Sequence, residues 1–328
     1  MNIMILSPGR RVEIIEYFKN EVQLRNGKVF TLDMNPYTSG LYFSNKYFCI
    51  KKDFNKLDEY MEHVLRICQS NNINCILTLI DPELPLLSSY KSRFEESGIR
   101  VMISDNKLVE ATFDKYEFFS FFKDKLPVLM TTDNKQELLS WLSQDLIHCP
   151  IFAKPKKGSG SSGLTVLNTK EEIINFKPDK EYIYQPFAKV KEYGVDMYFN
   201  LDSGKLVQYF IKEKLSMRSG ETDKSISVHN DDIKNIVMSL SETGFKGVVD
   251  MDIFLSDDNH YYVNEINPRF GGGYPHAYQC GMNYIQNLLD DLEVKSTSPL
   301  LDSYEDGIIM MKYNNYFFTK EKNIPKIQ

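Results

Sequence analysis

Apolar positions in the first hundred residues follow two alternating patterns. Short, continuous apolar runs have the length of buried strands, and the segments between them repeat apolar residues with the period of one helix face. Strands that alternate with helices predict a parallel sheet with helices on both of its faces. We therefore expect an α/β domain at the start of the chain. Its strands are expected at 3–6, 29–32, 75–79 and 100–103, and its helices at 12–24, 57–71 and 83–97.

Polar residues of this domain gather where the predicted strands end. Gly9 and Arg10 follow the first strand, and Asp33 follows the second. Asp81 and Glu83 come directly after the third. Ligands of such sheets bind outside the carboxyl ends of the strands. These residues are therefore candidates for contacts to a substrate, and a structural role in the turns is the alternative.

The pattern changes after residue 104, where a new structural unit begins. A helical segment at 105–122 is rich in aromatic residues, which we interpret as core rather than as a stacking surface. Strands dominate from residue 151 onward, and Asp202-Ser203-Gly204 is a hairpin signal between two of them. Further strands are expected at 151–166, 182–187, 194–200, 206–211, 248–254 and 308–313, and helices at 135–143 and 231–243.

Composition narrows the class of protein. The chain has 328 residues, of which 42% are hydrophobic and 26% charged, so it can form two or three domains with a substantial core. A net charge of −6 argues against a nucleic-acid partner, because such proteins usually carry a basic domain. No apolar run approaches the ~20 residues that cross a bilayer, and the N-terminus lacks a basic leader. We expect neither a nucleic-acid nor a membrane partner.

The cysteines predict neither a disulfide nor a zinc site. Their number is odd, their spacing is scattered, and no C-x-x-C pair occurs, so we interpret them as reduced thiols of a cytoplasmic protein. The histidines likewise form no ligand-spaced pair. The cysteines are Cys49, Cys68, Cys75, Cys149 and Cys280.

The segment 263–269 is the strongest functional signal. It places a carboxylate, a carboxamide and a guanidinium at alternate positions, Glu265, Asn267 and Arg269. Alternate residues of an extended chain point to the same side. A hairpin over the intervening residues would bring Asp252 beside Glu265. Carboxylate and amide oxygens suit Mg²⁺, and an arginine suits phosphate oxygens, so the pattern indicates a magnesium–nucleotide site.

A glycine- and serine-rich turn follows a lysine-bearing strand at 152–163. Glycine lets backbone amides approach an anion closely, and lysine supplies a positive charge. The segment lacks the order of a P-loop and does not lead into a helix. We interpret it as a β-hairpin flap over a triphosphate, and a solvated hairpin tip is the alternative.

Two further segments give weaker signals. The strand at 182–187 meets a proline, beside which free backbone groups could pair with adenine, and Glu192 follows within reach of a ribose hydroxyl. An ordinary edge strand is the alternative. The segment 212–224 carries several charged residues around Ser219-Gly220. Its position between two candidate nucleotide strands favours a functional role, and a solvated charged loop is the alternative.

Taken in order, these segments resemble the ATP-grasp enzymes, most closely the carbamoyl-phosphate-synthase-like carboxylate–amine ligases. The resemblance covers roughly residues 1–290. Its most specific motif is Glu265-Ile266-Asn267-Pro268-Arg269, followed by Phe270-Gly271-Gly272-Gly273-Tyr274-Pro275. Asp114-Lys115 and Ala153-Lys154-Pro155 come at the separations that the family has.

The resemblance implies a three-part architecture. An N-terminal α/β domain with a parallel sheet, of the pre-ATP-grasp type, would span 1–104. An α+β ATP-grasp fold with antiparallel sheets would follow, with a small lid subdomain at 105–183. The C-terminal subdomain, with a short C-terminal extension, would span 184–328.

The resemblance also assigns contacts to ATP. In this family two lysines contact the phosphates, a flap covers the β- and γ-phosphates, a hinge strand binds adenine and a carboxylate binds ribose. Gln185 stands where the family often has a glutamate. The matching residues are Lys115 and Lys154 for the phosphates, Gly158, Ser159, Gly160, Ser161, Ser162 and Gly163 for the flap, Gln185 and Phe187 for adenine, and Glu192 for ribose.

The metal and the reacting groups are assigned in the same way. Asp252, Glu265 and Asn267 match the ligands of Mg²⁺, for which Mn²⁺ is an alternative. Arg269 matches the arginine that steadies the γ-phosphate and the acyl-phosphate intermediate. The glycines at 271–273 would let a substrate approach Arg269, and a tight structural turn is the alternative. Our candidates for holding the substrate carboxylate or the transferring phosphoryl group are Arg218 and Lys214.

The implied activity is ATP-dependent ligation of a carboxylate to an amine through an acyl phosphate, with release of ADP and phosphate. We expect small-molecule carboxylate and amine substrates. A homodimer is a possible oligomeric state. One alternative is an ATP-grasp enzyme that makes a carbamoyl phosphate or another phosphorylated product. The other is a non-catalytic ATP-binding regulatory module.

Overall fold

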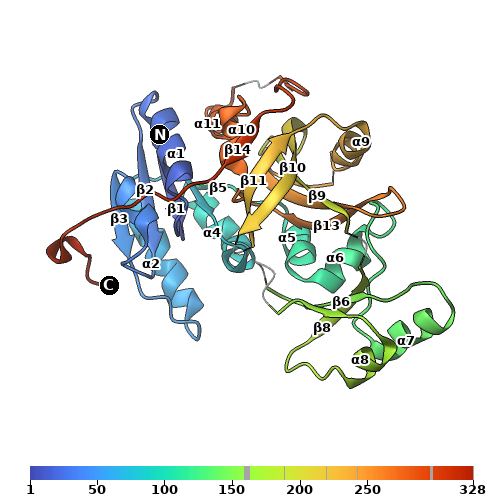
Figure 1. The fold of residues 1–328 in the computed structure, drawn as a ribbon. Helices are drawn as coiled ribbons and strands as arrows, with labels where there is room; N and C mark the ends of the chain where they lie inside the picture. The colour runs from blue at the N-terminus through green and yellow to red at the C-terminus, as the bar shows by residue number, and fades with distance from the viewer. Residues whose placement is uncertain (159–162, 188, 219, 242, 296–297, 328) are drawn as a thin grey trace.

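The computed structural model describes residues 1–328 except 159–162, 188, 219, 242, 296–297 and 328. An N-terminal α/β domain lies on one side, and an α+β body built on two antiparallel sheets lies on the other (Figure 1). This arrangement confirms the fold class expected from the sequence. Within the described residues, no helix combines the length and apolar character that a membrane crossing needs.

The N-terminal domain is a parallel sheet between two helical layers. Its elements are β1 (Asn2–Leu6), α1 (Val12–Gln23), β2 (Lys28–Asp33), η1 (Ser39–Phe43), β3 (Lys46–Cys49), α2 (Leu57–Ser70), β4 (Cys75–Thr78), η2 (Asp81–Glu83), α3 (Leu84–Ser89), α4 (Lys91–Glu96) and β5 (Arg100–Val101). The strand order is β3-β2-β1-β4-β5. Ile3 and Ile5 share a core with α1, whereas Met4 and Leu6 share one with α2. The loops after β1 and β4 therefore meet at the switch point of the sheet, where such folds place ligands.

Two details of this domain differ from the expected elements. The helix expected over 83–97 is divided into α3 and α4, which meet at Tyr90. Strand β3 was not expected, because it is a short edge strand with a single buried residue, Cys49. Short edge strands carry little of the apolar pattern by which buried strands are recognised.

A small subdomain follows the N-terminal domain. Its elements, with the two helices that lead into it, are α5 (Asn106–Phe113), α6 (Lys115–Phe122), α7 (Lys135–Ser143), β6 (Ile151–Pro155), β7 (Thr165–Leu167), α8 (Lys170–Asn175) and β8 (Tyr182–Pro186). The three strands form an antiparallel sheet in the order β7-β6-β8. Because β8 pairs with β6 as far as Pro186, the boundary expected after residue 183 falls inside this sheet and belongs after Pro186.

The large subdomain contains a six-stranded antiparallel sheet. Its elements are β9 (Lys191–Phe199), β10 (Leu206–Arg218), β11 (Glu221–Ser227), α9 (Asp231–Ser239), β12 (Gly247–Leu255), β13 (Tyr261–Asn267), α10 (Tyr274–Gln279), α11 (Tyr284–Leu292), β14 (Ile309–Met311) and η3 (Glu321–Asn323). The strand order is β13-β12-β9-β10-β11-β14. The charged segment 212–224 is thus a hairpin of β10 and β11, so its interpretation as a solvated loop is wrong.

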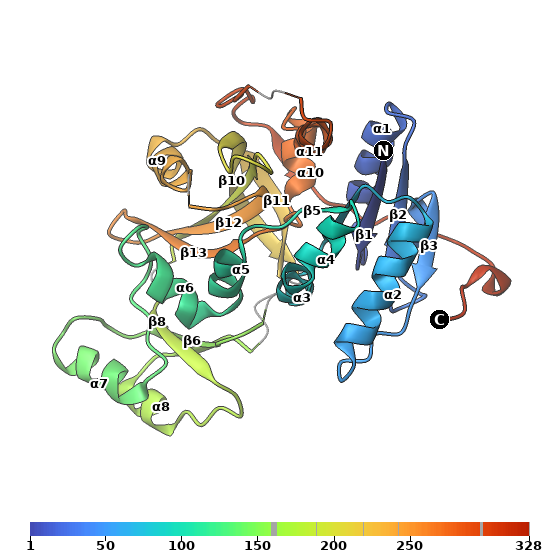
Figure 2. The same ribbon diagram turned by 180° about the vertical axis from the view of Figure 1, so that it is seen from behind.

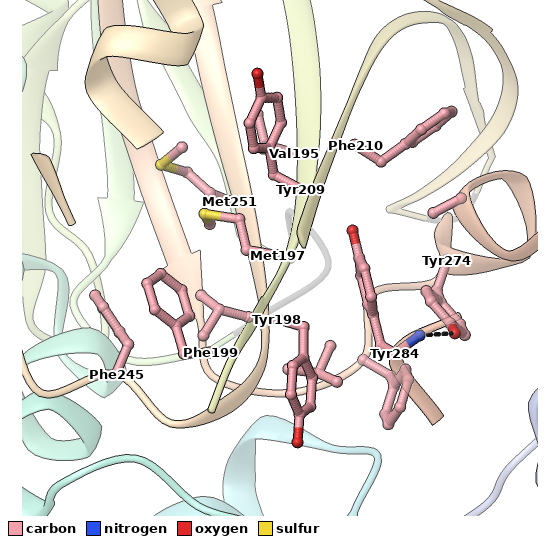
Figure 3. Packing of buried hydrophobic residues seen from close by; sticks show 14 of the residues in the cluster. Val195, Met197, Tyr198, Phe199, Tyr209, Phe210, Phe245, Met251, Tyr274 and Tyr284 are labelled. Carbon is pink, nitrogen blue, oxygen red and sulfur yellow. Dashed lines mark hydrogen bonds between the residues drawn. The ribbon is translucent and has the colours of Figure 1, made fainter. Parts of the chain in front are cut away.

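One continuous apolar core joins the large sheet to the N-terminal domain. Its part under the large sheet is rich in aromatic and methionine side chains (Figure 3). At the junction, the ring of Phe18 in α1 meets Phe270 edge-on with centroids 5.6 Å apart. Tyr17 stacks on Tyr278 of α10 with centroids 3.9 Å apart. These contacts hold the loop that follows β13 against the N-terminal domain.

The chain after β14 runs back across the N-terminal domain and ends beyond β3 (Figures 1 and 2). The ring of Phe317 packs on Tyr42 and Phe43 with centroid distances of 5.0 and 5.5 Å. Tyr47 Oη donates a hydrogen bond to the backbone oxygen of Asn323 over 3.5 Å. The C-terminal segment thus ties the outer strand of the large sheet to the N-terminal domain.

Candidate active site

The hairpin of β12 and β13 confirms the pairing expected from the sequence. Asp252 lies opposite Glu265, and Asp250 lies opposite Asn267. The Asn267 amide Nδ2 donates to Glu265 Oε1 over 3.2 Å, so these two side chains point to the same side. Asn259 in the turn adopts a φ of 63°, a conformation that asparagine tolerates better than most residues.

A β-bulge at Asn264 refines the simple alternation. The register shifts between the pairs Asp252–Glu265 and Ile253–Val263, which leaves Asn264 as an extra residue on β13. The bulge explains how Val263 and Ile266, three positions apart, are both buried. It also aims Asn264 at the small sheet, where its Oδ1 accepts a hydrogen bond from Lys154 Nζ over 2.8 Å.

Lys214 reaches across the large sheet to two carboxylates. Its ammonium lies 2.5 Å from Asp252 Oδ1 and 2.7 Å from Glu192 Oε1. The path from β10 to β12 passes over Gly194 of β9, where an added Cβ would lie 3.1 Å from the Cε atoms of both Lys214 and Lys212. A glycine at this position leaves room for both lysine side chains, and a larger side chain would force them to move. Lys212, two positions earlier on β10, pairs with the buried carboxylate of Asp196 on β9.

The carboxylates around Asp252 form an environment that suits a cation. Burial, with the neighbouring Asp250 and Glu265, raises the pKa of Asp252 to about 7 against the pull of Lys214. In the described part of the chain, His, Cys, Asp and Glu side chains form no ready group of three metal ligands. The expected set of two carboxylates and the Asn267 amide offers only oxygen donors, which fits Mg²⁺ once phosphate oxygens complete the shell.

The two lysines expected to bind phosphate lie on α6 and β6, and Lys154 of β6 contacts the β12–β13 hairpin. Lys115 begins α6, after the N-cap Asp114, and donates to the backbone oxygen of Gly158 over 2.7 Å. Burial lowers the pKa of Lys115, and burial lowers that of Lys154 to about 8, with Glu265 opposing the shift. Both ammonium groups would therefore be stabilised by an anion. The flap residues Ser159, Gly160, Ser161 and Ser162 lie outside the described residues, and Gly158 and Gly163 beside them have φ values of 125° and 79°.

The expected hinge residues surround the end of β8. Gln185 is buried and donates through Nε2 to Thr131 Oγ1 over 2.8 Å, while its Oε1 has no hydrogen-bond partner among the described residues. The half-exposed ring of Phe187 packs on Phe152 with centroids 4.4 Å apart. Glu192 accepts hydrogen bonds from Lys189 over 2.5 Å and from Lys214.

Arg269 joins the metal motif to the N-terminal domain. Its Nε and Nη2 atoms donate to the two carboxylate oxygens of Asp81 over 2.6 and 2.9 Å. Although burial opposes it, Asp81 raises the pKa of Arg269. Asp81 is thus a partner of Arg269. Glu83, by contrast, pairs with the buried Lys52 over 2.6 Å and has the structural role that we named as its alternative.

The glycines after Arg269 admit side chains of the protein itself. A Cβ at Gly271 would lie 2.4 Å from Asp250 Oδ1, and one at Gly273 would lie 2.7 Å from Lys212 Cε. The close approach that these glycines permit is therefore already used by neighbouring charged groups. Arg218, the other expected catalytic candidate, is exposed at the end of β10 and makes no ion pair with another described residue.

Sequence reasoning missed three residues of this site. Asp250 lies two positions before Asp252 on the same strand, so the alternation of β12 could have included it. Asn264 could not have been found, because the bulge that turns it has no reliable sequence signal. Lys189 is one of two lysines flanking Val190 and was not considered.

Two family models match the chain. Residues 3–102 match the model described as "PylC-like, N-terminal domain", and residues 112–273 match the one described as "ATP-grasp domain". Among curated proteins, a D-alanine–D-alanine ligase of Campylobacter concisus is 28% identical over 155 residues, which cover 41% of this chain and 44% of that one. The arginine-specific carbamoyl phosphate synthase large chain of Halalkalibacterium halodurans is 21% identical over 64% of this chain and 21% of that one. The chain therefore spans less than half the length of these relatives.

Solved structures match a larger share of the chain. An N5-carboxyaminoimidazole synthetase from Staphylococcus aureus superposes with a TM-score of 0.71 at 16% identity, over 91% of this chain and 78% of that one. The biotin carboxylase domain of a Hydrogenobacter thermophilus 2-oxoglutarate carboxylase, solved as a dimer with MgADP and bicarbonate, gives a TM-score of 0.75 at 13% identity. That match covers 94% of this chain and 73% of the other. At such identities the likeness concerns the fold.

Proposed function

The chain belongs to the ATP-grasp superfamily, and from this premise we propose that it is an ATP-dependent carboxylate–amine ligase. It joins a small-molecule carboxylate to an amine and releases ADP and phosphate. The observation that carries the proposal is the meeting of Lys154 from the small sheet with the β12–β13 hairpin, which bears Asp252, Glu265 and Asn267. Two buried lysines whose pKa values are lowered by burial, beside the carboxylates of the hairpin, suit a triphosphate that arrives with its metal.

The nucleotide contacts follow from the charges on the small subdomain. Lys115 and Lys154 hold the phosphates. Gln185 Oε1, which is buried, has an acceptor position open to the adenine amino group. Glu192 binds the ribose once it releases one of its two lysines. Phe187 closes the apolar side of the adenine site.

Asp252, Glu265 and Asn267 would hold Mg²⁺, with Mn²⁺ as a substitute. When bound, the ion supplies positive charge that offsets the repulsion between the triphosphate and the attacking carboxylate. Lys214, which pairs with Asp252 in the free protein, would contact the transferring phosphoryl group together with Arg269. Arg218, at the exposed end of β10, closes on the substrate from outside.

The reaction proceeds in two steps. A carboxylate oxygen attacks the γ-phosphorus, and the bond from this phosphorus to the bridging oxygen of ADP breaks, which leaves an acyl phosphate. The amine nitrogen then attacks the acyl carbon, phosphate departs with the electron pair of the C–O bond, and the nitrogen loses a proton to water. Lys214 and Arg269 stabilise the charge on the phosphoryl oxygens. Water has to be kept from the site during the reaction, because it would hydrolyse the acyl phosphate.

A pooled screen tests the proposal. Carboxylates and amines are incubated with MgATP, and released ADP, released phosphate and condensed products are measured together. We expect equal amounts of all three with the wild-type protein. Glu265→Gln should reduce turnover at least about a hundredfold, because it removes a charge that positions the metal and the phosphate. Glu59→Gln, an exposed carboxylate on α2, is the matched control and should leave turnover unchanged.

The same screen separates the alternatives. A carbamoyl phosphate or another stable phosphorylated product would appear as ADP without an equal amount of free phosphate. A regulatory module would bind ATP without forming ADP. Either result would replace the ligase proposal.

The cellular setting is part of the proposal. All five cysteines are free thiols, which fits the reducing cytoplasm where ATP is also available. The dimer of the biotin carboxylase domain supports a homodimer for this chain as well. Light scattering after gel filtration tests this, with a mass of twice 38.2 kDa as the expected result.

A further inference from the structure

Three basic side chains surround one carboxylate beside the proposed site. Arg10 and Arg11 lie in the turn after β1, and Lys312 directly follows β14. Their nitrogens lie 3.1, 3.6 and 3.5 Å from the carboxylate oxygens of Glu221 at the start of β11. We call Arg10, Arg11 and Lys312 the basic cluster. It brings together the N-terminal domain, the hairpin of β10 and β11, and the C-terminal segment.

The basic cluster adjoins the loop that follows the metal motif. Arg11 Nη1 and Arg269 Nη1 both donate to the backbone oxygen of Phe270, over 3.3 and 3.1 Å. The Glu221 side chain lies over Gly272, where an added Cβ would be 3.0 Å from its Cδ atom. A molecule bound at the basic cluster would therefore lie next to Arg269, where the reaction is proposed to occur.

The ion pairs of the basic cluster set three cations against one carboxylate. Among the described residues, Glu221 is the one carboxylate within ion-pair distance of these cations, and its contacts to Arg11 and Lys312 are longer than a normal charged hydrogen bond. Burial and mutual repulsion with the arginines lower the pKa of Lys312, although Glu221 opposes this. The Arg10 side chain is 66% exposed, and that of Lys312 is 31% exposed. The cluster thus has free N–H donors that solvent can reach.

We propose that the basic cluster binds an acidic group of one substrate that does not take part in the reaction. This inference rests on the proposed function, and it restricts the substrate class to molecules with such a group in addition to the reacting one. A carboxylate or a phosphate ester would serve, because both match the planar donor array of a guanidinium. In the free protein Glu221 occupies the same donors, and the substrate anion competes with it.

A role limited to holding the domains together would give a different pattern. An exposed arginine is not needed for that role, since the buried contact between Phe18 and Phe270 and the pair of Arg269 with Asp81 already join the two parts. A structural tie would also be satisfied by one cation for one carboxylate. The surplus of donors beside a reacting centre is what a binding site requires.

The first test compares matched substrates with and without the acidic group. Dicarboxylates are compared with monocarboxylates, amino acids with their amides, and phosphoethanolamine with ethanolamine. We expect turnover only with the substrates that carry the acidic group. The pairs also show whether the basic cluster binds a carboxylate or a phosphate. Arg10→Gln and Lys312→Gln should each raise KM for that substrate about tenfold or more, with kcat and the KM for ATP within about twofold.

A change of opposite sign makes the test specific. Glu221→Gln removes the competing anion, so it should lower KM for the acidic substrate. Arg93→Gln, which removes an exposed arginine that pairs with Glu62, is the matched control and should change nothing. Equal use of acidic and neutral substrates, or KM values that move in the same direction in the Arg10 and Glu221 variants, would overturn the proposal.

A binding measurement keeps this inference separate from the activity. With MgADP at saturation, succinate and phosphoethanolamine are titrated calorimetrically into the wild-type protein and into the Arg10→Gln/Lys312→Gln double variant. At least one probe should bind the wild type about tenfold or more tightly than the double variant. Binding of MgADP without any turnover would count against the ligase, whereas the absence of a difference between the two proteins would refute the acidic-group site.

Discussion

Lys154 illustrates how a single residue acquires its function from its surroundings. It lies on β6, contacts Asn264 of the opposing hairpin, and places its ammonium 5.2 Å from the Phe152 ring centroid and 5.7 Å from that of Phe254. Burial lowers its pKa to about 8 because few groups in the free protein compensate its charge. A bound polyphosphate would compensate that charge and raise the pKa again.

The pKa of Lys154 predicts a pH dependence of nucleotide binding. Below about pH 8 the ammonium is charged and attracts phosphate, and above it the free protein loses this charge. The dissociation constant for MgADP should therefore rise as the pH increases from 7 to 9. Lys154→Arg should flatten this profile, since arginine stays protonated over the whole range. An unchanged slope in the arginine variant would show that another group is responsible.

At the scale of elements, the β12–β13 hairpin was predictable and its bulge was not. Alternation placed Glu265 and Asn267 on one side, and the turn residues between the strands indicated the pairing with Asp252. The bulge at Asn264 depends on how β13 meets the small sheet, which local sequence does not record. The hairpin at 212–224 was hidden for a related reason, because its charges are compensated by partners on β9, on β12 and directly after β14.

Gly194 is an element-scale feature with a direct test. Its lack of a side chain lets Lys214 cross β9 and reach Asp252. Gly194→Val should displace Lys214 and reduce turnover at least about tenfold, and Gly194→Ala should have a smaller effect, because the lysine can yield by a few tenths of an ångström. Steady-state kinetics on both variants test this order. Wild-type turnover in the valine variant would contradict the proposed role of Lys214.

At the scale of the whole molecule, the N-terminal domain and the ATP-grasp body form one unit. They share an apolar core, and Arg269 crosses the junction to Asp81. The alternating pattern of the first hundred residues predicted the domain, and its loops were expected to bind a substrate. That Asp81 would hold Arg269 of the metal motif could not be predicted, because the two lie 188 positions apart in the sequence.

This junction predicts a difference between two ion pairs. Asp81→Asn weakens a largely buried, bidentate pair and should lower the free energy of unfolding by about 1.5–3 kcal/mol. Arg100→Gln breaks the exposed pair with Asp202, which also links the two parts, and should cost less than about 1 kcal/mol. Urea unfolding followed by fluorescence measures both. Equal effects would mean that burial of the junction contributes nothing.

The most direct test of the central claim follows oxygen from the carboxylate to the phosphate. A carboxylate substrate found in the screen is labelled with ¹⁸O in its carboxyl group, and the released phosphate is analysed by mass spectrometry after one turnover with MgATP and the amine. Formation of an acyl phosphate predicts that each phosphate carries one ¹⁸O atom from the carboxylate. Phosphate without label, or AMP in place of ADP, would contradict the ligase mechanism.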